Sequence, residues 1–355
     1  MSSSDDSFFR PRVALLTWEY PPEVTGGLGI ACEGIARALD RLTGVEVITP
    51  AGEAVDPYDC DPEDLEGGEY GALVLQRAAH ADVVHAHDWM TFPAAMAWAR
   101  QTGRPWVAHV HSLEIDRSGG MALPEIREIE GAGLRMADAV IAVSHRTAAR
   151  CVDEYGVSPE KLHVVHNGIE PVKPWRHETG VPRVSFIGRL TWQKAPDDFV
   201  EIAARIAEMN KVVQFTMAGR GEMGPELVER IAKHGLTRRF EMPGFIGREA
   251  VRALLARTDV LCMPSREEPF GLVALEAAAF AVPAVISTTA GVGELLPAAR
   301  HVEAGDVEGF AGRIWGLVVD PEWRRELGER SQLQAKWATW DRTAAAVIEV
   351  LRQVI

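Results

Sequence analysis

Short apolar runs alternate with longer stretches of helical periodicity along the chain. In the first half, the apolar runs cover residues 13–17, 45–49, 82–85, 106–110, 139–143 and 162–165. In the second half, they cover residues 183–187, 213–217, 239–242, 260–263 and 284–287. Short continuous apolar runs separated by helices are typical of parallel strands buried on both faces. The pattern therefore predicts an α/β protein with doubly wound parallel sheets.

The alternation stops once, at residues 170–180, where two prolines and many polar residues replace the periodic pattern. We interpret this stretch as a linker between two domains, residues 1–172 and 180–340. A chain of 355 residues suits two domains of this size. Two doubly wound halves place a cleft at the carboxyl ends of their strands, where such sheets bind ligands.

Composition and charge narrow the classes of partner. The chain has 37 basic and 51 acidic residues, which argues against nucleic acid as a partner. Its four cysteines are scattered without CxxC spacing, as in a reducing cytoplasm. The polar, acidic start is unlike a secretory signal, and no run of about 20 apolar residues predicts a transmembrane segment. We expect a cytoplasmic protein, and peripheral membrane contact remains compatible with the sequence.

The first candidate for chemistry is a glycine cluster around Gly26 and Gly27, which follows a predicted strand and opens a predicted helix. Glycines at such a place let backbone N–H groups approach an anion. The alternative interpretation is a purely structural turn, because the cluster matches neither a dinucleotide fingerprint nor a P-loop.

Two cations follow the first strand of the second half. Gly188 and Arg189 come directly after that strand, and Lys194 lies five residues beyond Arg189. Cations at the carboxyl end of a strand face the cleft, where arginine and lysine bind phosphate oxygens. The alternative is a pair of solvated surface charges.

The strongest candidate is the segment from residue 264 to 276. A predicted strand ends before it, and a helix is expected to begin near Gly271. Glu268 lies in the loop before this helix and Glu276 within it. The free N–H groups of Gly271, Leu272 and Val273 would point into the cleft at the positive end of the helix. The alternative assigns Glu268 to the helix start and Glu276 to a solvated face.

Histidines gather at the ends of two strands. His85 and His87 share one face of the first strand, and His109 and His111 follow on the next. A histidine pair of this spacing can bind a metal, but the sequence offers no third ligand at motif spacing, so no metal site is expected. Asp88 and His111 are better interpreted as polar groups that contact a substrate.

These segments together resemble a known family. Glu268 and Glu276 have the E-x7-E spacing of retaining GT-B glycosyltransferases, and the sequence looks like family 4 and the bacterial glycogen and starch synthases. Similar stretches occur elsewhere in family order: the turn at residues 19–29, the HAHDW run at 85–89, the turns at 142–145, 166–169 and 291–294, and the start of the last helix at 340. The resemblance spans almost the whole chain. It implies a GT-B fold whose C-terminal helix, residues 341–355, crosses back to the first domain.

The resemblance also implies roles for the candidate residues. Arg189 and Lys194 would hold the donor diphosphate, aided by backbone groups near Gly26, Gly27 and Gly188. Glu276 would bind the ribose and Glu268 the donor sugar, while His111 and Asp88 would line the sugar site. The remaining donor-binding positions follow from the same family turns: Phe245, Ile246, Phe270, Gly271, Leu272 and Val273.

The implied reaction transfers a hexose from a nucleotide-diphosphate sugar to a glycan or small hydroxyl acceptor, with retention and without a metal or other cofactor. Alternatives on the same fold are a polymerising glucan synthase, a sugar-nucleotide epimerase, a glycan phosphorylase, or a binding protein without turnover. Val24, Met90 and Ala195 depart from the glycogen synthase pattern, which weakens the assignment of glycogen as acceptor. Acceptor choice is expected in the loops at residues 52–70 and 112–124.

Overall fold

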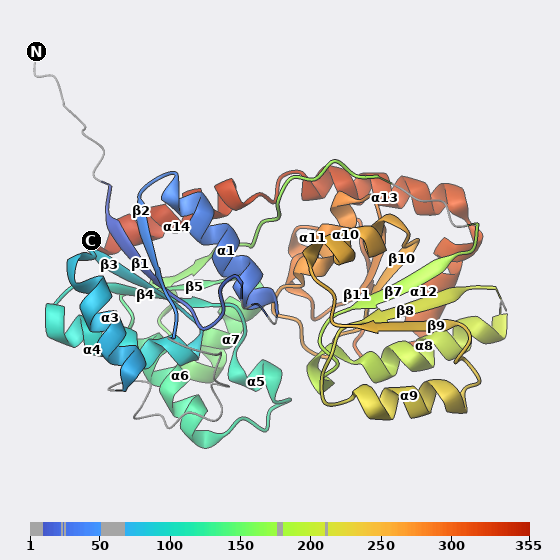
Figure 1. Cartoon of the computed structure of the whole chain (residues 1–355), viewed down its shortest axis with the longest axis horizontal. Helices are drawn as coiled ribbons and strands as arrows, with labels where there is room; N and C mark the ends of the chain where they lie inside the picture. The colour runs from blue at the N-terminus through green and yellow to red at the C-terminus, as the bar shows by residue number, and fades with distance from the viewer. Residues whose placement is uncertain (1–9, 23, 25, 51–67, 176–179, 210–211) are drawn as a thin grey trace, which may run out of the picture.

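The computed structural model describes residues 10–22, 24, 26–50, 68–175, 180–209 and 212–355. Two parallel sheets, each of six strands, lie side by side in it (Figure 1). The first sheet has the strand order β2-β1-β3-β4-β5-β6, and the second has the order β12-β11-β10-β7-β8-β9. This arrangement confirms the predicted doubly wound α/β class.

Strand bounds agree with the apolar runs to within two residues. The strands of the first sheet are β1 (Arg12–Leu16), β2 (Gly44–Ile48), β3 (Val83–His87), β4 (Trp106–Val110), β5 (Ala139–Ala142) and β6 (Leu162–Val164). Those of the second are β7 (Arg183–Ile187), β8 (Gln214–Ala218), β9 (Phe240–Gly244), β10 (Val260–Met263), β11 (Ala284–Ser287) and β12 (Arg300–Val302). Strand β12 was not predicted, because its alternation of polar and apolar residues is too short to stand out.

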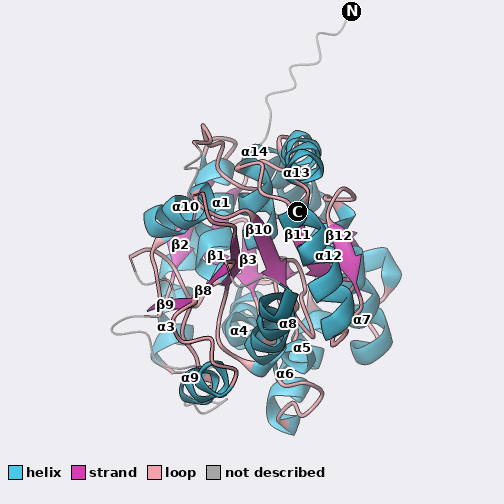
Figure 2. Ribbon diagram, turned by 90° about the vertical axis from the view of Figure 1, so that its right-hand side faces the viewer, coloured by secondary structure: helices cyan, strands magenta, loops and turns pink. Residues whose placement is uncertain are grey.

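Helices cover both faces of each sheet, as Figure 2 shows. Around the first sheet lie α1 (Gly27–Asp40), α3 (Glu69–Arg77), η2 (Ala78–His80), η3 (Trp89–Thr91), α4 (Phe92–Thr102), α5 (Glu114–Arg117), α6 (Pro124–Met136), α7 (His145–Tyr155) and η4 (Pro159–Lys161). Around the second lie η5 (Trp192–Lys194), α8 (Pro196–Met209), α9 (Gly224–Lys233), α10 (Arg248–Ala256), α11 (Leu272–Ala279), η6 (Gly291–Glu294), α12 (Val307–Val319) and α13 (Pro321–Ala335). The last helix is α14 (Trp340–Val354).

Each sheet separates two apolar clusters. In the first sheet, Val84 and Ala108 face the cluster under α4 and α6, whereas Val83 and Val107 face α1 and α14. Alternate residues of one strand therefore enter different clusters, which explains why these strands are continuous apolar runs. Helix α14 follows the second sheet in sequence but packs on α1 of the first, with the Trp340 ring against Gly34.

Three expectations about loops can be placed against the structure. Residues 51–67, most of the expected 52–70 loop, lie outside the described residues, and helix α3 begins at Glu69. The expected loop at 112–124 contains the short helix α5 and ends where α6 begins. Of the expected linker, residues 176–179 lie outside the described part. Within the described part of the chain, every helix is too short or too polar to cross a bilayer.

Candidate active site

The two strand orders fix where a ligand site can form. In the first sheet the order changes direction between β1 and β3, and in the second between β7 and β10. Crevices open at the carboxyl ends of strands on either side of such a point. The candidate residues follow these strands: the glycine cluster follows β1, Asp88 follows β3, Arg189 follows β7, and Glu268 follows β10.

Lys194 and Glu268 form the centre of the candidate site. Lys194 Nζ donates to both Glu268 carboxylate oxygens, at 2.8 and 2.7 Å, and Ser265 Oγ donates to one of them at 3.1 Å. Burial lowers the pKa of Lys194, and the negative charge of Glu268 acts in the opposite direction. The structure thus brings together two residues 74 positions apart, one cationic and one anionic.

Gly271 places the start of helix α11 beside Glu268. Its φ of 105° lies in the left-handed region, and a Cβ there would lie 2.9 Å from the Met263 methyl carbon and 3.3 Å from Glu268 Cγ. Only glycine fits this turn without displacing its neighbours. Phe270 is buried before it, and its carbonyl accepts from Val292 N at 2.8 Å. The backbone at Leu272 and Val273 forms the first turn of α11, the positive end of the helix dipole.

Arg189 follows β7, and its Nη2 donates to Gln193 Oε1 at 3.0 Å. The preceding Gly188 donates from its backbone N to the Ala218 carbonyl at 3.0 Å. The turn after β8, which was not predicted as part of the site, packs against the loop that carries Arg189. A Cβ on Gly219 would overlap the Gly188 carbonyl oxygen, and a Cβ on Gly221 would overlap the Leu190 backbone. The signal was present as two glycines directly after β8. These glycines let the two turns approach closely enough to hold the Arg189 loop.

Glu276 lies within α11, on the wall of a hollow that it shares with Arg248, Arg252 and Trp340. Burial raises its pKa to about 7, and the positive charges of Arg248 and then Arg252 oppose that rise. Glu276 is half-buried rather than freely solvated. The alternative that treated it as a solvated helix residue is therefore wrong.

The turn after β9 carries Phe245 and Ile246. Phe245 is 48% exposed, and the Arg220 guanidinium carbon lies 5.1 Å from the centre of its ring. Ile246 is half-buried. An exposed aromatic ring beside a cation at the carboxyl end of a strand is a surface on which a planar ligand can stack.

The glycine cluster of the first sheet meets the second half of the chain. Gly26 N donates to Glu19 Oε2 at 3.1 Å, which holds the turn in place. A Cβ on Gly27 would lie 3.9 Å from Leu272 Cδ1, so the start of α1 lies against the start of α11. The structure therefore brings two helix N-termini, one from each half, close to each other.

Asp88 is buried, and both of its carboxylate oxygens have partners within the protein. It is 1% exposed, and its Oδ1 accepts from His111 N at 2.7 Å. Its Oδ2 accepts from Arg117 Nη2 at 2.6 Å. Both carboxylate oxygens thus hold the loop after β4, and the expectation that Asp88 contacts a substrate stays a prediction. His111, which this loop carries, is half-buried and directly follows the last residue of β4.

The two halves are joined beside Glu268 by contacts that the sequence analysis did not foresee. Arg146 Nη2 lies 2.6 Å from Glu267 Oε2, and Ser144 Oγ donates to the Pro269 carbonyl at 2.7 Å. Glu294 accepts from the backbone N of His145 at 3.1 Å. The start of α7 in the first half therefore contacts the residues on both sides of Glu268, which are Glu267 and Pro269. The only sign of these contacts in the sequence is that an acidic residue, Glu267, lies next to Glu268.

Two family models match this chain. The model described as "Glycosyltransferase Family 4" matches residues 25–173, and "Glycosyl transferases group 1" matches residues 170–334. An alpha-maltose-1-phosphate synthase of Mycolicibacterium smegmatis is 30% identical over 97% of this chain and 99% of its own length. A glycogen synthase of Mycobacterium tuberculosis is 28% identical over 96% of this chain and 94% of its own.

Solved structures show the same fold at lower identity. A sucrose-phosphate synthase from Thermosynechococcus elongatus superposes with a TM-score of 0.82 at 20% identity, over 97% of this chain and 99% of the other. The Anabaena protein HepE in complex with UDP-glucose gives a TM-score of 0.79 at 19% identity, over 97% and 100%. The sheet topology, the two family models and the full-length relatives agree, and the chain belongs to the family 4 glycosyltransferases of GT-B fold.

Proposed function

We propose that this glycosyltransferase moves a hexose from a nucleotide-diphosphate sugar to a glycan or small hydroxyl acceptor, with retention of configuration and without a metal. The observation that carries the proposal is the Lys194–Glu268 pair beside the start of α11. A cation, a carboxylate and a helix N-terminus are there combined at one strand end, where both a leaving phosphate and a cationic sugar need stabilisation.

Each group has a defined part in the proposed reaction. Lys194 and Arg189 would neutralise the charge that grows on the diphosphate as the bond between the anomeric carbon and the phosphate oxygen breaks. The N–H groups at Leu272 and Val273 would add to this stabilisation. The acceptor oxygen forms the new bond on the same face of the sugar, and its proton passes to the departing phosphate oxygen. Glu268 would stabilise the positive charge that the sugar carries between the breaking of the bond to phosphate and the forming of the bond to the acceptor.

The donor is proposed from the hollow around Glu276 and the surface around Phe245. Glu276 would accept hydrogen bonds from the ribose hydroxyls, and the base would lie near Phe245 and Ile246. The structure of the fold relative HepE is a complex with UDP-glucose, and two sequence relatives are named as a glycogen synthase and an alpha-maltose-1-phosphate synthase. Glucose is therefore the first sugar to test.

The test begins with thermal unfolding in the presence of UDP, ADP, GDP and their glucose, mannose and N-acetylglucosamine conjugates. Stabilisation by one base series is expected and identifies the donor. Transfer is then followed by proton NMR, which reads the anomeric configuration of the product directly. An inverted product would refute retention, and loss of all transfer in EDTA would refute the metal-free reaction.

Variants separate transfer from the alternatives on this fold. Arg189→Ala and Lys194→Ala are each expected to lower turnover strongly with donor, whereas Lys233→Ala, an exposed lysine of α9, should not. Donor isomerisation without an acceptor would favour an epimerase. Product formation from a sugar phosphate and glycan alone, with no nucleotide, would favour a phosphorylase. Donor binding with no turnover for any acceptor would favour a binding protein.

A further inference from the structure

Four histidine rings stack at the carboxyl ends of β3 and β4, the two central strands of the first sheet. Strands β3 and β4 are neighbours, with His87 opposite His109, so the alternate positions of both strands gather on the face toward α1. His85 Nε2 lies 3.1 Å from His109 Nδ1, and His87 Nδ1 lies 2.8 Å from His111 Nε2. His85, His87 and His109 are fully buried, and His111 is half-buried.

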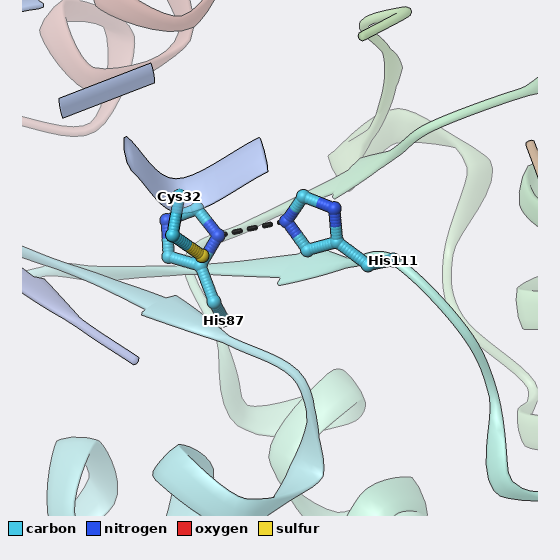
Figure 3. A group of neighbouring side chains, drawn as sticks. All are labelled: Cys32, His87 and His111. Atoms are coloured by element: carbon cyan, nitrogen blue, oxygen red, sulfur yellow. Dashed lines mark hydrogen bonds between the residues drawn. The ribbon is translucent and has the colours of Figure 1, made fainter. Parts of the chain in front are cut away.

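Helix α1 adds a thiol to this cluster. Cys32 is fully buried, and one ligand atom from each of Cys32, His87 and His111 lies within 4.8 Å of the others. Figure 3 shows the cysteine and the two rings facing one another from α1, β3 and the end of β4. The sequence had suggested no third ligand for a metal, because Cys32 is 55 residues away from His87 along the chain and only the packing of α1 brings it close.

Three ring nitrogens of the cluster are buried without a hydrogen-bond partner among the described residues: His85 Nδ1, His87 Nε2 and His109 Nε2. His87 uses Nδ1 toward His111, whereas its Nε2 is buried without a hydrogen-bond partner among the described residues. A neutral imidazole carries one N–H and one lone pair, so whichever Nε2 carries is left unsatisfied. A cation bound at one nitrogen of His87 takes the lone pair there, and the ring proton then lies on the other nitrogen.

We propose that Cys32, His87 and His111 form a binding site for a thiophilic divalent cation, with zinc as the preferred ion. A thiolate and two imidazoles are ligands that zinc favours, and water would fill the fourth position of a tetrahedral site. Harder cations such as magnesium prefer oxygen ligands and should not compete. The ion has no part in the sugar transfer proposed above.

The proton balance of binding follows from the protonation of the three ligands. A histidine binds the ion as a neutral imidazole and a cysteine binds it as a thiolate. A cysteine thiol ordinarily ionises only near pH 8.5, so near pH 7 the sulfur carries a proton before the ion binds. Formation of the zinc–sulfur bond therefore breaks the S–H bond and releases one proton to solvent.

Binding has a consequence that rests on the proposed function. The family resemblance implies that His111 lines the sugar site, so an ion held by its ring would exclude the donor sugar. Zinc is expected to inhibit transfer reversibly, with recovery on chelation. The binding itself does not depend on turnover, so the two proposals can fail separately.

Cobalt absorption tests the site without any substrate. All proteins carry Cys60→Ser, because Cys60 lies outside the described residues and could bind metal on its own account. Titration with Co²⁺ is expected to produce a thiolate charge-transfer band and tetrahedral d–d bands, both lost on adding Zn²⁺. The bands should vanish in Cys32→Ala and persist in Cys151→Ala, a matched removal of another buried thiol. A parent protein without the charge-transfer band, or a Cys32→Ala variant that keeps it, overturns the proposal.

Calorimetry and inhibition supply the second reading. Zinc titrations in two buffers of different ionisation enthalpy should count one proton released by the parent and none by Cys32→Ala. Cys32→Ala should transfer sugar normally and resist zinc at least about tenfold better, and His87→Asn should also bind zinc more weakly. Circular dichroism and thermal midpoints establish that each variant is folded. Zinc binding without proton release would mean that surface carboxylates bind the ion, which rejects the site.

Discussion

Lys194 Nζ contacts both oxygens of Glu268, and the two side chains are only 19% and 7% exposed. A buried pair of this kind gives modest net stability, but the removal of either partner leaves the other charge uncompensated. Before any donor binds, the lysine that is proposed to receive the diphosphate is thus already held in place by the carboxylate. The same pair links the loop after β7 to the loop after β10.

Breaking this pair should separate stability from catalysis. Lys194→Met is expected to reduce the free energy of unfolding by about 3 kcal/mol, because Glu268 is left buried and unpaired. The double variant Lys194→Met with Glu268→Gln should recover most of that loss in urea unfolding. In both the single and the double variant, kcat/KM should fall about a hundredfold to a thousandfold. Restored activity in the double variant would show that the pair is only structural.

The sequence predicted the fold and the start of helix α11 well, for a physical reason. The strands are apolar on both faces, so their runs are visible without any tertiary information, and motif spacing located Glu268 and Glu276 on either side of a helix start. The contacts between the two halves of the chain could not be predicted from the sequence. The residues around Glu267 do not identify Arg146 as its partner. A salt bridge between residues 121 positions apart depends on how the two sheets face each other. The proximity of Cys32 to His87 could not be predicted for the same reason.

The Arg146–Glu267 contact should act on catalysis through the position of Glu268. Glu267 also lies 3.3 Å from Arg150 Nη1, so two arginines of α7 hold it. Glu267→Gln keeps the shape but removes the charge, and these partly exposed pairs contribute little to stability. We expect kcat to fall about tenfold with a nearly unchanged thermal midpoint, because closure around donor is impaired. Small-angle scattering with and without donor provides the second measurement.

Glu329→Gln, which removes an exposed ion pair with Arg325 on α13, is the matched control. It should alter neither turnover nor the scattering change on donor addition. If Glu267→Gln behaves like this control in both measurements, the contact between α7 and the Glu268 loop has no role in catalysis.

Glu130 should make stability depend on pH. It is 1% exposed, and burial raises its pKa to about 8 despite hydrogen bonds from Tyr155 and from the Glu114 backbone. The unfolded chain ionises this group near pH 4.5, so its contribution is complete below that pH and is lost as the pH rises toward 8. The whole difference corresponds to on the order of 5 kcal/mol.

Glu130→Gln is neutral at every pH and should remove this dependence. We expect the variant to be more stable than the parent at pH 9 and to differ little from it at pH 4.5, as measured by urea unfolding across that range. Glu128→Gln changes an exposed carboxylate on the same helix and should leave the curve unaltered. Parallel curves for the parent and Glu130→Gln would show that Glu130 is ionised in the fold.

Gly34 is required where α1 crosses α14. A Cβ at this position would overlap the indole of Trp340, which is buried between the two helices. Gly34→Ala should therefore reduce the free energy of unfolding by about 1–3 kcal/mol, even though alanine is the better helix former. Gly312→Ala is the control, because Gly312 lies on α12 with open space around the added methyl, and it should stabilise the protein by about 0.4–1 kcal/mol. Trp340→Leu in the Gly34→Ala background should restore part of the loss, since the smaller side chain makes room for the methyl group. Equal and favourable effects of the two glycine substitutions in urea unfolding would mean that α14 is not packed on α1 through this residue.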